Sequence, residues 1–163
     1  MGRYMSLLAW GLGIALIAWL FANMERERSI PTASSLTTPE GTREVRLTLN
    51  RYNHYVTHGE INKQPVVFFL DTGASMVSVP EKIARQLGLK AGQQYVVNTA
   101  KGDAHVFATR IPELSIGPIK FTDVVGSINP HTDDDKILLG MTVLKNLELI
   151  QRGKTLIMRQ YIR

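Results

Sequence analysis

Residues 66–75 read VVFFLDTGAS, and this stretch decides the fold. The run Val66–Leu70 is apolar on both faces, which is typical of a central strand that is covered on both sides. The strand delivers Asp71 at its end, where a charge is costly to bury unless something compensates it. An Asp-x-Gly sequence also suits an ordinary tight turn, but a turn aspartate normally follows polar residues. The apolar strand therefore favours a carboxylate that has a function.

The chain around this strand alternates apolar and polar residues with a period of two. Val45, Leu47 and Leu49 predict a half-buried strand. Further strands are predicted at 54–61, 76–79, 95–99, 105–109, 114–116, 119–125, 137–140, 148–150 and 155–159. Short helices are predicted from Pro80 to Gly88 and over Met141–Leu147. Many short strands separated by turns predict an all-β domain that forms a closed or orthogonal barrel.

The N-terminal part of the chain has a different composition. Tyr4–Met24 holds 21 residues without a charge, and a helix of this length spans roughly 31 Å, which matches the hydrocarbon core of a bilayer. Leu20 would stand three residues before the best cleavage site, which fits a signal peptidase badly, so an uncleaved anchor is expected. Residues 1–24 are thus predicted to be a transmembrane signal anchor, 25–42 a flexible linker rich in Ser, Thr and Pro, and 43–163 a single domain.

The charges beside the anchor do not decide its orientation. Arg3 precedes the apolar segment, whereas Arg26 and Arg28 follow it, so a count of positive residues leaves the topology open. A short N-terminus followed by one helix and a folded domain is nonetheless the layout of a signal anchor.

Composition excludes several kinds of site. The chain has no cysteine, which excludes disulfides, thiolate metal sites and a cysteine nucleophile. Its net charge of +5 comes from singly spaced residues, and no basic cluster with interleaved aromatics indicates a nucleic-acid partner. His54 and His58 have no third ligand nearby in the sequence, and Asp133–Asp135 lacks the alternating ligands of an EF-hand. We therefore expect no metal site and no cofactor.

Three elements follow one another along the domain. The first is Asp71–Thr72–Gly73–Ala74–Ser75, the second a hairpin with its tip at Lys101, Gly102 and Asp103, and the third Leu138–Leu139–Gly140 followed by a short helix. In this order the elements resemble the retropepsin-like (clan AA) aspartic proteases: the catalytic motif, the flap, and the second motif of two apolar residues and a glycine. With its N-terminal anchor, the chain looks most like the membrane-anchored bacterial members of that clan.

The resemblance implies a single-lobe acid protease barrel over 43–163 and an aspartic endopeptidase that hydrolyses peptide bonds in protein or peptide substrates. By the same resemblance Asp71 is catalytic, Thr72 locks two active-site loops together through its hydroxyl, and Gly73, Ala74 and Ser75 support the site. Such enzymes hold a water between two carboxylates about 3 Å apart that share one proton. Because the chain has only one Asp-Thr-Gly motif, a homodimer in which Asp71 faces Asp71 is expected.

The sequence departs from the viral members at two positions. Met141 stands where those enzymes carry an arginine, and Met76 rather than Asp follows Ser75, so the ion pair of the viral enzymes is missing. These departures leave the type of dimer contact open. A rival hypothesis is a catalytically silent binding or dimerisation module with the same fold, tethered to a membrane. The intact Asp-Thr-Gly favours the enzyme, because a binding groove has no need of a costly carboxylate pair.

Two further expectations concern specificity and location. Val77, Val79 and Ile137 are predicted to line the substrate pocket, which favours apolar side chains beside the scissile bond. The layout also implies a single-pass protein of the bacterial inner membrane with its protease domain on the periplasmic side.

Overall fold

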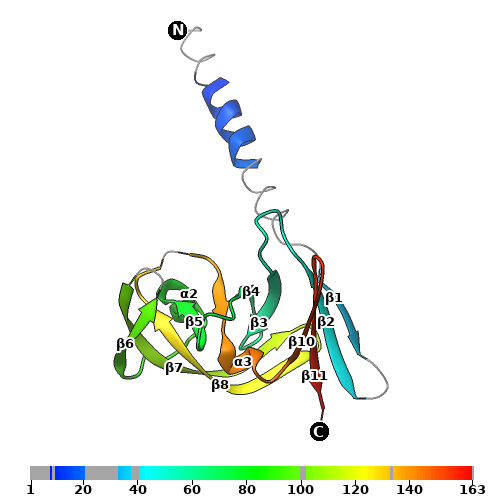
Figure 1. Ribbon diagram of the computed structural model, residues 1–163. Coiled ribbons are helices and arrows are strands. Elements are labelled where there is room, and N and C mark those ends of the chain that lie inside the picture. The colour runs from blue at the N-terminus through cyan, green and yellow to red at the C-terminus, as the bar shows by residue number, and fades with distance from the viewer. Residues whose placement is uncertain are drawn as a thin grey trace. The chain divides into compact units, whose positions relative to one another are not determined.

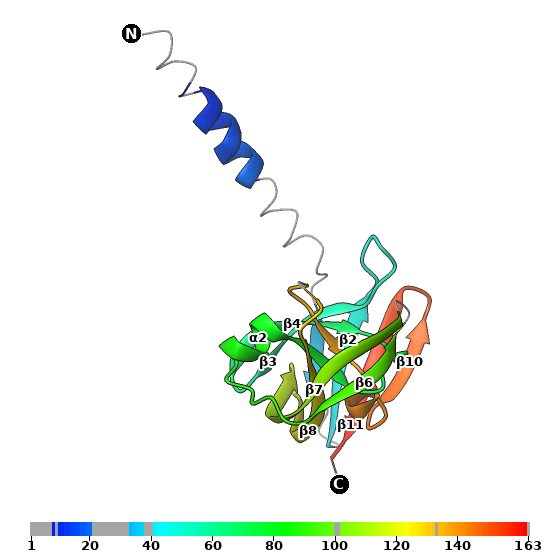
Figure 2. The same cartoon turned by 90° about the vertical axis from the view of Figure 1, so that its left-hand side faces the viewer.

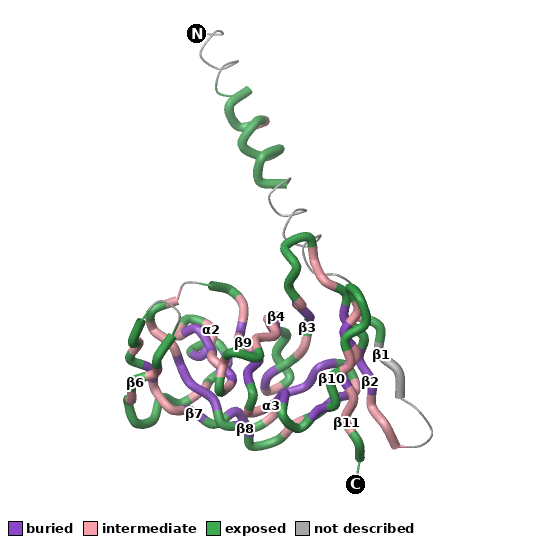
Figure 3. Tube along the Cα trace, in the orientation of Figure 1, coloured by how far each residue is buried: buried purple, intermediate pink, exposed green. Residues whose placement is uncertain are grey.

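The computed structural model of this 163-residue chain describes residues 8, 10–20, 33–37, 41–99, 102–132 and 134–162. The chain divides into two compact units, residues 1–30 and 31–163. In the first unit, residues 8 and 10–20 are helical, and nearly all the side chains described there are exposed (Figure 3). None of the helices in these described ranges is both long and apolar enough to cross a membrane. The rest of the predicted anchor Tyr4–Met24 lies outside the described residues.

The second unit contains two sheets. The smaller is an antiparallel sheet of four strands built from both ends of the domain, in the order β1-β2-β11-β10 (Figure 1). Its strands are β1 (Ser34–Thr37), β2 (Thr42–Thr48), β10 (Glu148–Arg152) and β11 (Thr155–Tyr161). The sheet is therefore complete within a single chain.

Strand β1 differs from the flexible linker expected over 25–42. Ser34–Thr37 pairs with β2 through the register Ser34↔Arg46 to Thr37↔Arg43. The sequence SSLT has no apolar period and so gave no sign of a strand. An edge strand does not need one, because backbone hydrogen bonds to its neighbour can hold it. The prediction of a flexible coil was wrong for these four residues, whereas 25–32 and 38–40 lie outside the described residues.

The larger sheet has seven strands in the order β3-β4-β9-β5-β8-β7-β6, and an additional pairing between β3 and β7 closes it into the predicted barrel. The strands are β3 (Val56–Ile61), β4 (Gln64–Leu70), β5 (Val77–Pro80), β6 (Gln94–Thr99), β7 (Gly102–Ile116), β8 (Ile119–Asn129) and β9 (Ile137–Leu139). Only β6 lies outside the closed ring, where it pairs with β7 (Figure 2). The all-β barrel is thus confirmed.

Two short helices interrupt the strands, as predicted. Helix α2 (Glu81–Gln86) begins directly after Pro80, whose fixed φ suits a helix start, and the chain turns out of it at Gly88 with φ +67°. Helix α3 (Met141–Leu144) follows Gly140. It is shorter than the predicted Met141–Leu147.

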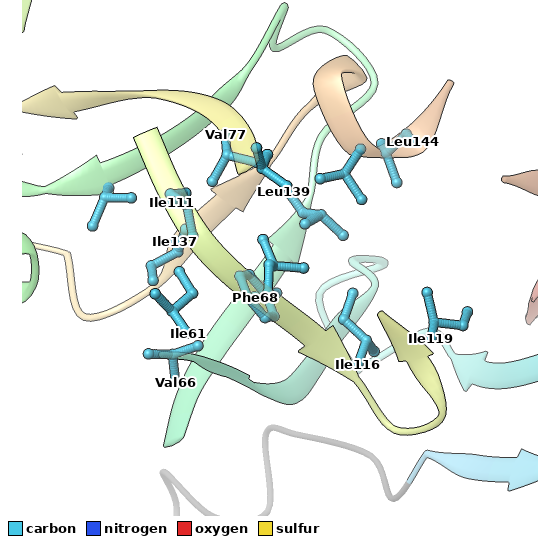
Figure 4. Close-up of a cluster of buried hydrophobic side chains, with 14 of the residues drawn as sticks. Ile61, Val66, Phe68, Val77, Ile111, Ile116, Ile119, Ile137, Leu139 and Leu144 are labelled. Atoms are coloured by element: carbon cyan, nitrogen blue, oxygen red, sulfur yellow. The ribbon is translucent and has the colours of Figure 1, made fainter. Parts of the chain in front are cut away.

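The barrel is filled by apolar side chains that point inward from its strands. Phe68 of β4 is completely buried, and Figure 4 shows it among Ile61, Ile116 and Leu139. Burial of each such side chain contributes roughly 1.5–3 kcal/mol. The core therefore fixes the position of β4 and of the residue that follows it, Asp71.

Candidate active site

Asp71 lies where two parallel strands end together. Strand β9 runs parallel to β4 and pairs Leu70 with Leu139. The backbone N–H of Asp71 then donates to the Leu139 carbonyl at 3.2 Å. Because β9 lies between β4 and β5 in the sheet, the loop 71–76 must cross the end of β9 to connect them. The two predicted motifs therefore meet in space.

The loop folds back around the Asp71 carboxylate. The N–H of Gly73 donates to Asp71 Oδ1 at 2.8 Å, and the N–H of Ala74 donates to the Asp71 carbonyl at 3.2 Å. A Cβ on residue 73 would lie 3.1 Å from the same Oδ1, so glycine allows this close approach. Asp71 as a residue is half-buried, and the loop's own backbone orients its carboxylate.

Gly140 and the start of α3 hold the other side of the loop. The N–H of Met141 donates to the Ala74 carbonyl at 2.8 Å, and the Thr142 hydroxyl accepts the N–H of Val77 at 3.1 Å. A Cβ on Gly140 would lie 2.3 Å from the Met76 carbonyl oxygen, a distance that no side chain permits. The glycine of the second motif thus serves loop packing rather than chemistry.

A cavity of about 480 Å³ opens beside Asp71. Its lining brings together most of the predicted first motif and Leu138 of the second motif, with strand β6 across from them. The lining residues are Asp71, Gly73, Ala74, Ser75, Met76, Ser78, Val97, Asn98, Thr99, Val106, Ser127, Asn129 and Leu138. Thr72 is exposed and does not line the cavity, and Leu139 is buried in the core.

The predicted flap is the hairpin of β6 and β7. Its register ends at Thr99↔Gly102, where the Thr99 hydroxyl donates to the Gly102 carbonyl at 2.7 Å. Gly102 has a φ of +105°, and Asp103 accepts a hydrogen bond from the Asn98 amide at 3.1 Å. Lys101 lies outside the described residues. Gly102 and Asp103 shape the hairpin, whereas residues 97–99 of β6 and Val106 of β7 line the cavity.

One contact joins this hairpin to the loop 71–76. The hydroxyl of Tyr95 on β6 lies 2.8 Å from Met76 Sδ. The sequence alone did not predict this contact, because the two residues are far apart in the chain and come together only when β6 lies over the loop.

The structure corrects the expected pocket residues. Val77, Val79 and Ile137 are completely buried in the barrel core and do not line the cavity. Side chains alternate between the two faces of a strand, so the face that carries these residues points inward and the opposite face meets the cavity. Sequence reasoning missed the residues of that opposite face, Ser78 and Ser127. The alternation Val77–Ser78–Val79 was the available signal.

The described residues contain no group of three His, Cys, Asp or Glu side chains that could hold a metal ion. His54 packs its ring 4.8 Å from that of Phe69. Asp134 and Asp135 lie 3.4 and 3.2 Å from the Lys136 ammonium group, which accounts for part of the acidic run, and Asp133 lies outside the described residues.

Comparisons with known proteins agree with this geometry. The model of the family described as gag-polyprotein putative aspartyl protease matches residues 57–146, which include the Asp71 loop, the hairpin and Gly140. A Sinorhizobium protein, described as an uncharacterized protein in the cobV 5′ region, is 31% identical over 122 residues. That match takes in 73% of this chain and 52% of the relative, so the chain spans about half the relative's length.

The structural comparison points to the same group. The crystal structure of a retropepsin-like aspartic protease from Rickettsia conorii resembles this chain with a TM-score of 0.59 at 20% identity. The similarity covers 80% of this chain and 97% of that one, and at this identity it shows the shared fold. With the family match over more than half of its length, the chain belongs to the gag-polyprotein aspartyl protease family and has the retropepsin-like fold.

Proposed function

We propose that this chain is an aspartic endopeptidase whose active form is a homodimer. The observation that carries the proposal is the carboxylate of Asp71, fixed by the Gly73 N–H and aimed at a cavity beneath the β6–β7 hairpin. A peptide lying in this cavity as an added strand would bind between the catalytic loop and the hairpin.

The chemistry requires a second carboxylate. Among the described residues that line the cavity, Asp71 carries the only one. In the proposed dimer one Asp71 accepts a proton from water, whose oxygen attacks the peptide carbonyl carbon, while the protonated partner Asp71 hydrogen-bonds the carbonyl oxygen. The tetrahedral intermediate then breaks its C–N bond as the nitrogen receives a proton. No covalent bond to the enzyme forms.

Thr72 supports the same arrangement. Its side chain is exposed beside Asp71, and its hydroxyl makes no hydrogen bond to another described residue. In the dimer this hydroxyl would bond the loop of the second copy, which holds the two carboxylates together.

The proposal also places the chain in the bacterial inner membrane, with Tyr4–Met24 as an uncleaved anchor and the protease domain in the periplasm. Its support is the sequence, 21 residues without a charge. A C-terminal alkaline phosphatase fusion, active only after export, should be active, whereas a C-terminal green fluorescent protein fusion should be dark. The opposite pattern, or release of the chain by alkaline carbonate, would contradict this placement.

Catalysis is tested with the full chain in detergent micelles. Wild type and Asp71→Asn are incubated with a mixed peptide library from pH 4 to 7, and the products are identified by mass spectrometry. Asp123→Asn is the matched control, because it makes the same charge change at an exposed β8 position paired with Arg110, where φ of +53° suits asparagine. We expect cleavage by wild type and Asp123→Asn and none by Asp71→Asn. Cleavage that persists without Asp71 would refute the proposal, and a folded dimer that cuts nothing would favour the binding module.

A further inference from the structure

The floor of the cavity is a row of paired residues across three strands. Ser78 on β5 pairs with Leu138 on β9 and with Ser127 on β8. Residues paired directly across strands point to the same face, with Cβ atoms about 5 Å apart. All three line the cavity that contains Asp71. Two hydroxyl groups therefore lie side by side next to one apolar side chain.

The hydroxyl of Ser127 has an unusual environment. The residue is only 3% exposed, yet it borders the cavity. Neither it nor the Ser78 hydroxyl forms a hydrogen bond to any side chain or backbone group of the described residues. A hydroxyl can donate one hydrogen bond and accept two. Burying it away from water without any hydrogen-bond partner costs free energy. While the cavity is open, water can fill these positions.

A substrate side chain that fills the cavity must displace that water. An aliphatic side chain would leave both hydroxyls unpaired, whereas a side chain with a hydrogen-bonding tip would replace the water. Asn129 adds a further polar group to the cavity. Its Oδ1 accepts the His131 N–H at 2.9 Å, which leaves the two N–H donors of its side-chain amide for a ligand. The floor thus discriminates by hydrogen bonding.

The walls of the cavity determine which substrate side chains fit above the polar floor. Val97, Val106 and Leu138 are apolar and suit an apolar stem. Apart from Asp71, the described residues that line the cavity carry no charge. An anionic tip would therefore be buried without a counter-charge, which is costly, and a cationic tip could pair only with Asp71, the carboxylate that the proposed reaction needs.

We infer that this cavity is a specificity subsite for uncharged, hydrogen-bonding side chains with an apolar stem, such as Thr, Asn and Gln. The inference rests on the proposed peptidase function and reverses the apolar preference expected from the sequence. Because a symmetric dimer holds two copies of the cavity, the preference should occur at two positions on opposite sides of the scissile bond.

The test uses peptides that differ only in the polarity of one side chain of nearly constant shape: Thr against Val, Asn against Leu, and Gln against Met, at each position in turn. Binding is measured by fluorescence anisotropy with the Asp71→Asn chain, and cleavage with wild type by kcat/KM. We expect about tenfold preference for the polar member of each pair at the two subsite positions, equivalent to one buried hydroxyl left unpaired.

Variants identify the residues responsible. The double variant Ser78→Ala/Ser127→Ala should reduce the preference to within about twofold, because its floor no longer offers hydroxyls. Ser127→Thr, which keeps a hydroxyl, should retain the preference. Ser115→Ala is the matched control: this serine on β7 is also buried but borders a separate hollow with His58 and Lys120. It should leave the preference unchanged.

The outcomes separate this inference from the proposed function. Preferential binding of polar members without any cleavage would support the subsite and refute the peptidase. Cleavage of both members at equal rates, or a preference that survives the double variant, would refute the subsite and leave the peptidase standing. Failure of the Asp71→Asn chain to bind any of the peptides would overturn the inference.

Discussion

Gly140 illustrates how much of the active-site loop depends on the absence of one side chain. Three contacts of a hypothetical Cβ would be shorter than 3.0 Å: 2.3 Å to the Met76 carbonyl oxygen, 2.6 Å to the Ala74 carbonyl oxygen and 2.6 Å to the Met76 carbonyl carbon. All of these atoms belong to the backbone of the loop 71–76, which cannot move aside as a flexible side chain would. The second motif therefore affects the position of Asp71 indirectly, because Gly140 allows the loop that carries Asp71 to pack on α3.

Replacement of this glycine should be severely destabilising. We expect Gly140→Ala to lower the free energy of unfolding by about 3 kcal/mol, since overpacking of a fixed backbone forces a shift of the loop. Gly153→Ala is the control, because its Cβ meets nothing within 4 Å and only its φ of +58° opposes the change, at about 1 kcal/mol. Urea unfolding followed by circular dichroism measures both. Equal losses for the two variants would show that the contact with the loop carries no energy.

Strand β7 shows what sequence patterns reveal about elements and what they miss. The sequence predicted two strands, 105–109 and 114–116, whereas β7 runs without a break over Gly102–Ile116. Pro112 lies within β7 and has no N–H to donate to a neighbouring strand, so a proline at this position favours an interruption of the strand. The fold accommodates it because Pro112 has no partner in the ladder: Ile111 pairs with Val124 and Glu113 with Thr122. Asp123 of β8, left opposite, has a φ of +53°.

The other differences between prediction and structure also arise from pairing. Apolar periodicity and turn residues were enough to predict the barrel and both helices, whereas the two motifs of the site were identified by their resemblance to a known family. Periodicity could not predict β1, which is held by the edge of β2. The alternation Val77–Ser78–Val79 indicated that Val77 lies on the buried face, but not that the polar face with Ser78 lines the cavity. What each face of a strand meets depends on the partner strands, which lie far away in the sequence.

The pairing of β2 with β11 carries a partly buried ion pair between Glu44 and two arginines. Glu44 is only 6% exposed, and its carboxylate accepts from Arg159 Nε at 2.6 Å and from Arg46 Nε at 2.7 Å. The hydrogen bond from Arg159 is the main reason why the pKa of Glu44 lies below its usual value, and Arg46 lowers it further. A lowered pKa in the folded state means that this stabilisation is present above the unfolded pKa and is lost as the pH falls through the folded pKa.

We therefore expect Glu44→Gln to be less stable than wild type by roughly 1.5–3 kcal/mol at pH 7, as for hydrogen bonds to charged groups. The difference should shrink as the pH falls below about 4.5, the unfolded value. Thermal unfolding from pH 3 to 7 measures it. Glu60→Gln, at an exposed position of β3, should follow wild type at every pH. Parallel curves for wild type and Glu44→Gln would contradict the assigned role of the ion pair.

The β6–β7 hairpin should affect activity more than stability. Gly102 has a φ of +105° and open space around its Cα, so Gly102→Ala meets only backbone strain of about 1–2 kcal/mol. Because the strain falls on the hairpin that covers the cavity, we expect kcat/KM for a cleaved peptide to fall about tenfold. Gly88→Ala, with φ of +67° at the end of α2, carries similar strain away from the cavity. It should lose stability but keep its activity, and equal activities of the two variants would exclude a role for the hairpin.

At the scale of the whole molecule, the strands from the two ends of the domain pair with each other within one chain. Strands from the two termini form the sheet β1-β2-β11-β10 without a second copy. In the proposed dimer the contact then falls on the active-site loops and hairpins, where Thr72 is exposed.

Thr72→Val should weaken the dimer without weakening the protomer. Loss of the hydroxyl would remove the proposed hydrogen bond between the two copies, so we expect the dimer dissociation constant to rise about tenfold, which corresponds to about 1.4 kcal/mol. The unfolding midpoint of the dilute monomer should not change. Sedimentation equilibrium measures the first quantity and thermal unfolding the second. Thr122→Val, at an exposed position of β8, is the control, and an unchanged dissociation constant for Thr72→Val would remove Thr72 from the contact.

The self-contained terminal sheet has a consequence for how a cell would regulate the proposed enzyme. In the proposed dimer, a protomer whose own terminal strands are paired with each other would separate from its partner without breaking the sheet β1-β2-β11-β10. Well below the dissociation constant, the number of catalytic centres then grows with the square of the number of copies made. A twofold change in expression would then alter proteolysis about fourfold, so the activity of the proposed dimer would respond steeply to how much of the chain is made.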